Sequence, residues 1–498
     1  MKYISTRGNF QGVEAAEAIR TGMVPAGGLF VPEEIPVFSL QEIREMAGKK
    51  YQEIALQVLE RFLTDYSREE LNDSIQGAYE RRKFPPTEVV PVIGLTDNLY
   101  LMELWHGPTA AFKDMALQLM PRLLMRAIKK AELKKEIVIL VATSGDTGSA
   151  ALEGFKDLEG VKIIVFYPAE GVSEIQELQM TTVDGKNTYV VGVKGNFDDC
   201  QSAVKAIFAD QDLKDLMAAN AYQFSSANSI NWGRLVPQIV YYFSAYAELL
   251  KNKSIRSGDK INFVVPTGNF GNILAAWYAM SMGLPVNRLI CASNENNVLT
   301  DFIISGTYDR RREFHKTLSP SMDILISSNL ERLLYELSGK DSGLIRGYMN
   351  DLIEKGFYTV NDSIREQIQS KFWAGFSSDR ETIECIRSVY QDYGYVLDTH
   401  TAVAMDVYDK YVIYTGDLTP TVIVSTASPF KFNQSVAKAL FEDEAEGLDE
   451  FELLKLLSEK TGWEIPVGLK DLDKREIIHK TVCDKDKMGD IVMHFLNV

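Results

Sequence analysis

A lysine beside a short apolar segment is the first residue of this chain whose setting could support chemistry. Lys113 follows Ala110-Ala111-Phe112 and precedes a helical pattern. A lysine amine attacks a carbonyl only when it is neutral, and desolvation by these neighbours would lower its pKa in that direction. The chemistry indicated is a Schiff base with an aldehyde, typically pyridoxal phosphate. For Lys113 taken alone, an ordinary solvated lysine is the commoner explanation.

Two glycine-rich turns each follow an apolar, strand-like run and open a helical one. They are Thr143-Ser144-Gly145-Asp146-Thr147-Gly148-Ser149 and Pro266-Thr267-Gly268-Asn269-Phe270-Gly271-Asn272. Glycines let backbone N–H groups approach an anion, and the helix N-terminus adds a favourable partial charge, so a phosphorylated ligand could be held there. Each turn alone is equally consistent with a strand-to-helix connection that needs glycine for its conformation. Neither turn contains the dinucleotide fingerprint or a P-loop, which disfavours a nucleotide.

The elements that must position these residues alternate between strand-like and helical from residue 89 onward. The strand-like runs are 137–141, 161–167, 189–193, 222–225, 261–265, 288–292 and 421–425, with helical runs such as 235–250 and 272–282 between them. This alternation predicts an α/β fold with doubly wound, largely parallel sheets. Both glycine-rich turns fall at the carboxyl ends of strands, where such sheets bind ligands.

Residues 1–90 show a different pattern, with helical periodicity at 40–49, 51–63 and 69–82. We therefore predict an N-terminal accessory domain over 1–90 and a catalytic domain over 91–498. The catalytic domain is expected to contain two interleaved α/β subdomains, of which the smaller spans roughly 140–250.

Composition limits the class of function. The net charge of −16 and the pI near 5.0 argue against a nucleic-acid partner, so an anionic substrate must be attracted by a local cationic pocket. Four scattered cysteines show no paired spacing, and neither disulfides nor a metal site are expected. No apolar run has the length of a signal peptide core or a membrane helix. We expect a cytoplasmic protein without a membrane partner, either a monomer or a homodimer.

With the lysine and both turns in place, the chain resembles the threonine synthase family of fold-type-II (tryptophan-synthase-β-like) pyridoxal phosphate enzymes. The most specific parts of the resemblance are His106-Gly107-Pro108-Thr109-Ala110-Ala111-Phe112-Lys113-Asp114 and Asn228-Ser229-Ile230-Asn231-Trp232-Gly233-Arg234. Further agreement in order and spacing comes from 5–8, 27–32 and 425–429. The resemblance implies pyridoxal 5'-phosphate as the cofactor. It also implies conversion of O-phospho-L-homoserine and water into L-threonine and phosphate.

The resemblance assigns roles to the cofactor-binding residues. Lys113 matches the lysine that forms the Schiff base and later moves protons as general base and acid. Asp146 matches the residue that faces the cofactor's ring oxygen. Thr426 matches the hydroxyl at the pyridine nitrogen, a weaker electron sink that suits elimination and replacement. The backbone amides expected to hold the cofactor phosphate are those of Gly268, Asn269, Phe270, Gly271 and Asn272.

Substrate contacts are expected from Ser144, Thr147, Asn231 and Arg234. Arg234 is the leading candidate for the substrate phosphate, because a planar guanidinium offers paired donors; the alternative is a structural ion pair. Ser144 and Thr147, with Asp146, could bind the substrate carboxylate.

Several other residues have a structural explanation that is commoner than a functional one. We expect His106 to be a satisfied structural group, Asp114 to orient the helix after Lys113, and Trp105 and Trp277 to lie in the core. Many relatives carry a histidine where this chain has Ser428. Any catalytic contribution of that histidine is therefore absent or relocated here.

Two other functions remain open at this point. One is a phospholyase or dehydratase that releases a 2-oxo acid and ammonia instead of adding water. The other is a non-catalytic metabolite-binding relative, against which the intact Lys113 and phosphate loop argue.

Overall fold

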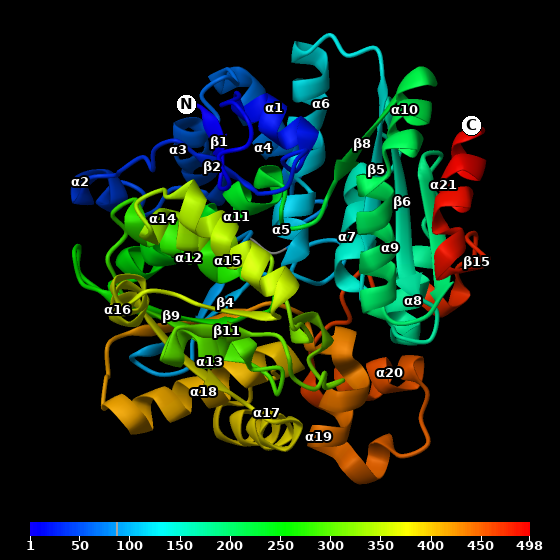
Figure 1. Ribbon diagram of the computed structural model, residues 1–498. Coiled ribbons are helices and arrows are strands. Elements are labelled where there is room, and N and C mark those ends of the chain that lie inside the picture. The colour runs from blue at the N-terminus through cyan, green and yellow to red at the C-terminus, as the bar shows by residue number, and fades with distance from the viewer. Residues whose placement is uncertain (86–87) are drawn as a thin grey trace.

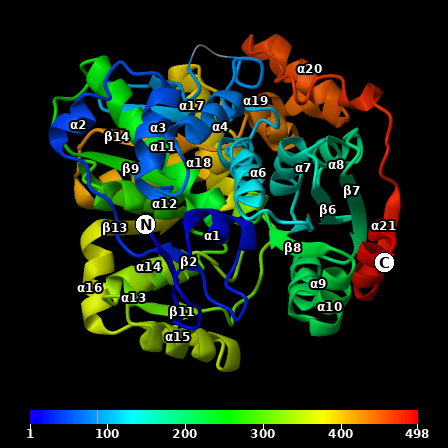
Figure 2. The ribbon, with the colours of Figure 1, turned by 90° about the horizontal axis from the view of Figure 1, so that it is seen from above.

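In a computed structural model the chain forms two sheet-centred units and a helical N-terminal region (Figure 1). The structure describes residues 1–85 and 88–498. The predicted α/β fold with largely parallel sheets is confirmed, and each of the seven strand-like runs forms a strand of one of the two main sheets. Figure 2 shows the small sheet with α9, α10 and α21 on one side of the molecule, and α12 and α16 of the large unit on the other.

The N-terminal region is a short antiparallel ribbon with helices packed around it. β1 (Tyr3–Ser5) pairs with β2 (Phe30–Pro32), and the helices are α1 (Ala15–Thr21), α2 (Leu40–Arg44), α3 (Tyr51–Phe62) and α4 (Arg68–Ala78). The three helices predicted here are confirmed, although the first is shorter than expected. α2 starts at the Ser39 capping box but ends at Arg44, and the chain then turns through Gly48, whose φ of 82° suits glycine.

The large sheet has six strands in the order β13-β10-β9-β14-β4-β3. All neighbours are parallel except β3, which runs antiparallel to β4 at one edge. Its strands are β3 (Val92–Gly94), β4 (Leu99–Glu103), β9 (Ile261–Pro266), β10 (Val286–Ser293), β13 (Phe372–Phe376) and β14 (Thr421–Ser425). The central strands are buried along their length because helices cover both faces, as parallel sheets require.

The small sheet has five parallel strands in the order β15-β7-β6-β5-β8. They are β5 (Glu136–Ala142), β6 (Val161–Pro168), β7 (Thr188–Lys194), β8 (Tyr222–Ser226) and β15 (Thr481–Asp484). The range predicted for the smaller subdomain, 140–250, does not include β15 or the terminal helix α21 (Met488–Leu496). Figure 1 shows both in red along the outer edge of this sheet.

The remaining helices pack against the two sheets directly or through one another. Those of the small unit are α7 (Asp146–Phe155), α8 (Glu174–Thr181), α9 (Phe197–Ala209) and α10 (Gln211–Ala219). The others are α5 (Lys113–Leu117), α6 (Met120–Lys130), α11 (Trp232–Lys251), α12 (Gly271–Ser281), α13 (Val298–Ser305), α14 (Leu330–Leu337), α15 (Ser342–Glu354), α16 (Asp362–Lys371), α17 (Asp379–Tyr393), α18 (Thr399–Thr415), α19 (Asn433–Ala445) and α20 (Glu450–Thr461). A separate antiparallel pair joins β11 (Thr307–Asp309) to β12 (Phe357–Thr359). Within 1–85 and 88–498, none of the helices combines the length and the apolar character needed to cross a membrane.

The contact between α5 and α7 depends on a glycine. A Cβ placed on Gly154 in α7 would lie 2.0 Å from the carbonyl oxygen of Leu117, the last residue of α5. We expect Gly154→Ala to force these helices apart and to lower the free energy of unfolding by about 1–3 kcal/mol. Chemical denaturation measures this change. Gly347→Ala is the matched control, because Gly347 lies inside α15 with no atom within 4 Å of its Cβ position. That variant should be neutral or stabilised by about 0.5–1 kcal/mol.

A buried carboxyl group in α14 makes stability depend on pH. Burial raises the pKa of Glu336 to about 7, and its Oε1 has no hydrogen-bond partner among the described residues. The folded protein therefore holds this proton more tightly than the unfolded chain. The resulting destabilisation is absent below about pH 4.5, grows as the pH rises through 7, and is then constant.

We therefore expect Glu336→Gln to raise the free energy of unfolding by about 1–3 kcal/mol at pH 8 and by little at pH 4.5. Urea denaturation at both pH values tests this. The exposed Glu366 on α16 gives the control Glu366→Gln, for which the difference between the two pH values should vanish. An equal effect of Glu336→Gln at both pH values would contradict the expectation.

Candidate active site

The site is a cavity of about 760 Å³ that opens between the two sheets. It lies at the carboxyl ends of β5, β9 and β14, where parallel sheets bind their ligands. Of the residues predicted from the sequence, those that line it are Lys113, Ser144, Asp146, Thr147, Arg234, Gly268, Asn269, Phe270, Gly271, Asn272 and Thr426. Residues from five separate parts of the chain are thereby brought to one cavity.

Hydrogen bonds at Thr109 and at Phe112 hold the loop that carries Lys113. Asp114 accepts hydrogen bonds from the Thr109 N–H at 2.8 Å and the Thr109 hydroxyl at 2.9 Å. The Phe112 N–H donates to the Thr426 carbonyl at 2.8 Å, and Ala110 adopts a φ of 58°, which is rare for alanine. These bonds fix the start of α5, and with it the direction of the lysine. They also confirm the prediction that Asp114 orients this segment.

Lys113 is buried, and its amine faces a carboxylate and a hydroxyl. Nζ donates to Asp146 Oδ2 at 3.1 Å and to Ser321 Oγ at 3.2 Å. Burial lowers the pKa of Lys113, and Asp146 opposes that shift while Lys431 and Arg234 add to it. This is the direction predicted from the apolar neighbours, and it favours a nucleophilic amine.

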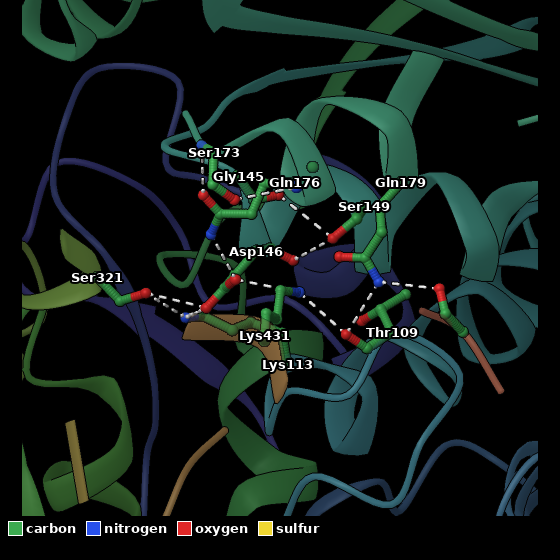
Figure 3. Close-up of polar contacts among 12 residues, drawn as sticks. Thr109, Lys113, Gly145, Asp146, Ser149, Ser173, Gln176, Gln179, Ser321 and Lys431 are labelled. Carbon is green, nitrogen blue, oxygen red and sulfur yellow. Dashed lines mark hydrogen bonds and ion pairs between the residues drawn. The ribbon is translucent and has the colours of Figure 1, made fainter. Parts of the chain in front are cut away.

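Asp146 is the centre of the polar network in Figure 3. One carboxylate oxygen, Oδ2, faces Lys113 and accepts from Ser321 Oγ at 3.0 Å. The other, Oδ1, faces Lys431 Nζ at 3.1 Å and accepts from Gln176 Nε2 at 3.0 Å. Burial acts to raise the pKa of Asp146, but the nearby Lys113 and Lys431 amines hold it well below its usual value. This carboxylate is therefore ionised.

The turn after β9 presents free backbone donors to the cavity. The N–H groups of Gly268, Asn269, Phe270 and Gly271 donate to no acceptor in the described part of the chain. A Cβ on Gly268 would lie 2.7 Å from the Ser321 carbonyl, so only glycine fits there. Phe270 takes a φ of 60° as it opens α12. Such a row of N–H groups before a helix N-terminus is an anion cradle.

Arg234 is a buried guanidinium without an acidic partner. It is 3% exposed and lines the cavity, and burial lowers its pKa to about 10. One of its nitrogens donates to the Ala227 carbonyl, whereas Nε has no partner among the described residues. No carboxylate whose side chain the structure describes forms an ion pair with it. The structural ion pair considered from the sequence is therefore not found among these described side chains.

Asn231 and Ser428 have structural roles and do not line the cavity. Asn231 was expected to contact substrate, but it does not line the cavity: its amide donates to the Ile19 and Ser226 carbonyls, and its oxygen caps α11 by accepting from the Gly233 N–H. Ser428 lies outside the cavity too and caps the 3-10 turn Pro429–Phe432. Both side chains are occupied by backbone groups.

The residues expected to be structural agree with those expectations. His106 contacts Glu103 at 2.6 Å and stacks on Trp105, away from the cavity lining. Trp105 and Trp277 are both buried.

Sequence reasoning missed four residues of this network: Gln176, Ser321, His400 and Lys431. His400 lines the cavity and is held by Asp398, whose Oδ1 lies 3.0 Å from His400 Nδ1. Nδ1–H therefore donates to Asp398, and Nε2 is left to accept from the Ser321 N–H at 3.2 Å. The sequence Asp398-Thr399-His400-Thr401 carries a helix N-cap pattern, which was the available signal. Ser321 stands in a segment with no motif of its own. Lys431 follows Thr426 and Ser428 in a segment that resembles the family, but the sequence analysis assigned it no role.

The residues present fit a phosphorylated aldehyde. A buried lysine amine, a cradle of free N–H groups and a hydroxyl residue at Thr426 converge on one cavity at the carboxyl ends of the strands. The fold and the site define a pyridoxal-phosphate-dependent enzyme of fold type II. Profiles of three families match the chain. They are "Threonine synthase N terminus" over 2–79, "Pyridoxal-phosphate dependent enzyme" over 82–353, and "Threonine synthase, C-terminal" over 401–486.

Individual relatives agree with these profiles. The chain is 39% identical to threonine synthase of Pseudomonas aeruginosa over 444 residues, which covers 88% of this chain and 90% of that one. It is 42% identical to human threonine synthase-like 1 over 435 residues, 85% of this chain, but spans only 58% of that protein's length. The chain belongs to the threonine synthase family of pyridoxal-phosphate-dependent enzymes.

Solved structures support the same assignment. The structure of PLP-bound threonine synthase from Brucella melitensis superposes with a TM-score of 0.87 at 36% identity and covers 100% of this chain and 98% of that one. Threonine synthase from yeast superposes with a TM-score of 0.88 at 34% identity, with the same coverage. The predicted cofactor, pyridoxal phosphate, is thus confirmed at the level of the family.

Proposed function

We propose that this protein is a threonine synthase, which converts O-phospho-L-homoserine and water into L-threonine and phosphate. The observation that carries the proposal is Arg234, a buried cation that lines the same cavity as Lys113 and has no counter-ion among the described side chains. The N–H cradle after β9 serves one phosphate group, that of the cofactor. Arg234 provides for a second anion, as a phosphorylated substrate requires.

The chain's own side chains supply binding and proton transfer. When bound, pyridoxal phosphate supplies the electron sink that makes the substrate's Cα and Cβ protons removable. Lys113 Nζ, once displaced by the substrate amine, is the group that moves protons at Cα and Cβ, because burial favours its neutral form. Arg234 holds the phosphate on Cγ and stabilises the charge that develops as this group leaves.

Four further residues hold the reacting groups in place. Asp146 would face the ring oxygen of the bound cofactor, and Gln176 and Ser321 fix its carboxylate. Thr426 would offer the pyridine nitrogen a neutral hydroxyl, which would restrain full protonation of the ring and favour elimination and replacement. Ser144 and Thr147, at the start of α7, are the donors proposed for the substrate carboxylate.

Incubation with O-phospho-L-homoserine tests the proposal. We expect stoichiometric L-threonine and phosphate, measured by amino-acid analysis and a phosphate assay. Formation of 2-oxobutyrate and ammonia instead would identify a phospholyase or dehydratase. A protein that takes up pyridoxal phosphate but leaves O-phospho-L-homoserine unchanged would be a binding relative and would overturn the proposal.

The proposal also covers the cellular compartment, the oligomeric state and the domain organisation of the enzyme. Cys200, Cys291, Cys385 and Cys483 are all buried free thiols, which supports a reducing compartment such as the cytoplasm. We propose a monomer or homodimer with an accessory domain over 1–90 and a catalytic domain over 91–498. In this division, the smaller subdomain gains the C-terminal β15 and α21 by their packing on β7 and α9.

A further inference from the structure

Lys431 is a second buried lysine at the site, and it takes no part in the proposed proton transfers or substrate binding. It lies on the 3-10 turn Pro429–Phe432, behind the cavity, and its side chain is 0% exposed. Its Nζ faces Asp146 Oδ1 at 3.1 Å and donates to the Thr109 carbonyl at 2.9 Å. Burying an ammonium group costs several kcal/mol of solvation, which only paired and hydrogen-bonded geometry offsets. The position of Lys431 therefore needs a physical reason.

The two oxygens of the Asp146 carboxylate have different lysine partners. Lys113 and Lys431 approach different oxygens of it at the same distance of 3.1 Å (Figure 3). His400 is the third charged or titratable group that acts on this carboxylate. Arg234 also acts on Lys113, and Asp114 lies close enough to Lys431 to feel its charge. One carboxylate thus faces two ammonium groups, of which only Lys113 reaches the cavity.

We infer that Lys431 is a positioning residue that holds Asp146 by one oxygen and keeps the Lys113 amine available to the cofactor. The inference rests on the proposed function, in which Lys113 must react as a free amine. A single carboxylate with a single lysine would stabilise the Lys113 ammonium. A second ammonium on the same carboxylate repels the first and favours loss of its proton.

Lys431 has a second effect after Lys113 has reacted. Lys113 Nζ condenses with the cofactor aldehyde, loses water, and no longer pairs with Asp146 as a free ammonium group. A buried carboxylate left without a cation would take up a proton. Lys431 takes no part in that condensation, so it keeps Asp146 charged and anchored beside the cofactor. Its bond to Thr109 also ties down the loop that carries Lys113.

Competitive acetylation of the full chain, freed of cofactor, tests this directly. Acetylation of Lys113 is followed by peptide mass spectrometry from about pH 6 to about pH 11, a range that spans free and buried lysines. We expect the midpoint for Lys113 to move to higher pH in Lys431→Met, and the acetylation rate at neutral pH to fall several-fold. Lys431→Arg, which keeps the charge, should restore the wild-type midpoint. Lys438→Met, at an exposed lysine of α19, is the matched control and should leave it unchanged.

The Asp146→Asn background shows whether Lys431 acts through Asp146. There, Lys431→Met should move the Lys113 midpoint by less, because only the direct repulsion between the two ammonium groups remains. An unchanged midpoint in the single variant, or an equal shift in the Asp146→Asn background, overturns the inference. If Lys431→Met does not fold, Lys431→Gln retains hydrogen-bond donors without the charge and gives the same comparison. In the cofactor-loaded protein, the pH midpoint of the visible absorption should move upward in parallel.

Failure of the proposed function has a different signature. A protein that takes up no pyridoxal phosphate, or makes no threonine, would still give the Lys113 acetylation midpoints in its cofactor-free form. The two conclusions are therefore tested separately.

Discussion

Replacing Lys113 with alanine should remove the covalent link to the cofactor and lower turnover of O-phospho-L-homoserine by at least about 10³-fold. The loss is large because one amine serves both as the attachment point and as the group that moves protons. The free N–H groups of the turn 268–271 remain in Lys113→Ala, so this variant should still bind pyridoxal phosphate non-covalently. Phosphate release measures turnover. Borohydride reduction followed by mass spectrometry measures the covalent link.

The control is Lys129→Ala, at an exposed lysine of α6, which should keep wild-type turnover and a reducible cofactor link. A small primary amine added to Lys113→Ala should restore part of the turnover, because the missing group is an amine in a cavity of about 760 Å³. The assignment of Lys113 would be wrong if the alanine variant kept more than about a tenth of the turnover, given the 10²-fold lower limit usual for such proton transfers. It would also be wrong if borohydride fixed the cofactor to Lys431.

Local signals in the sequence were sufficient for the parts of the site that are continuous in the chain. β5 and β9 are apolar runs that end in glycine-rich turns, and both the strands and the turns were predicted. The free N–H groups of the second turn follow from backbone conformation, which glycine and the start of α12 determine locally. The direction of the Lys113 pKa shift was also predicted, although its cause is burial in the folded site and not the apolar neighbours in the sequence alone.

Local sequence patterns could not predict which distant segments come into contact. Lys431 reaches Asp146 because the Thr426–Ser428 segment is hydrogen-bonded to the loop that carries Lys113, and nothing near Lys431 in the sequence indicates that pairing. His400 and Ser321 meet only because α18 packs under the turn Pro320–Met322. β15 joins the small sheet from the far end of the chain.

For Asn231, the sequence predicted a substrate contact, whereas the structure shows a structural role. Its motif suggested a substrate contact, yet asparagine at a helix start is favoured as an N-cap, and the structure uses it in that way. A polar residue beside a functional one thus has to be weighed against the needs of the local backbone. Arg234, three residues later, differs because its Nε has no partner among the described residues and is not used by the local backbone.

Arg234→Met should lower kcat/KM for O-phospho-L-homoserine by about 10²–10³-fold, because hydrogen bonds to a charged group contribute about 1.5–3 kcal/mol each and a guanidinium offers two to a phosphate. Stability should change in the opposite direction. Arg234 is a buried cation without a carboxylate partner in the described part of the chain, so a methionine of similar length removes a desolvation penalty at the cost of one bond to Ala227. Thermal unfolding of the cofactor-free protein should therefore shift to higher temperature.

This combination separates a binding role from a structural one. A structural arginine would, on removal, lower activity and stability together, whereas a substrate-binding arginine maintained at an energetic cost lowers activity alone. Arg234→Lys keeps the charge but loses the paired donors, so its kcat/KM should lie between those of the wild type and the methionine variant. Arg380→Met, at an exposed arginine of α17, should change neither quantity. Loss of pyridoxal phosphate affinity in Arg234→Met, with unchanged kcat/KM once cofactor is saturating, would instead assign Arg234 to the cofactor phosphate and remove the observation on which the proposed substrate depends.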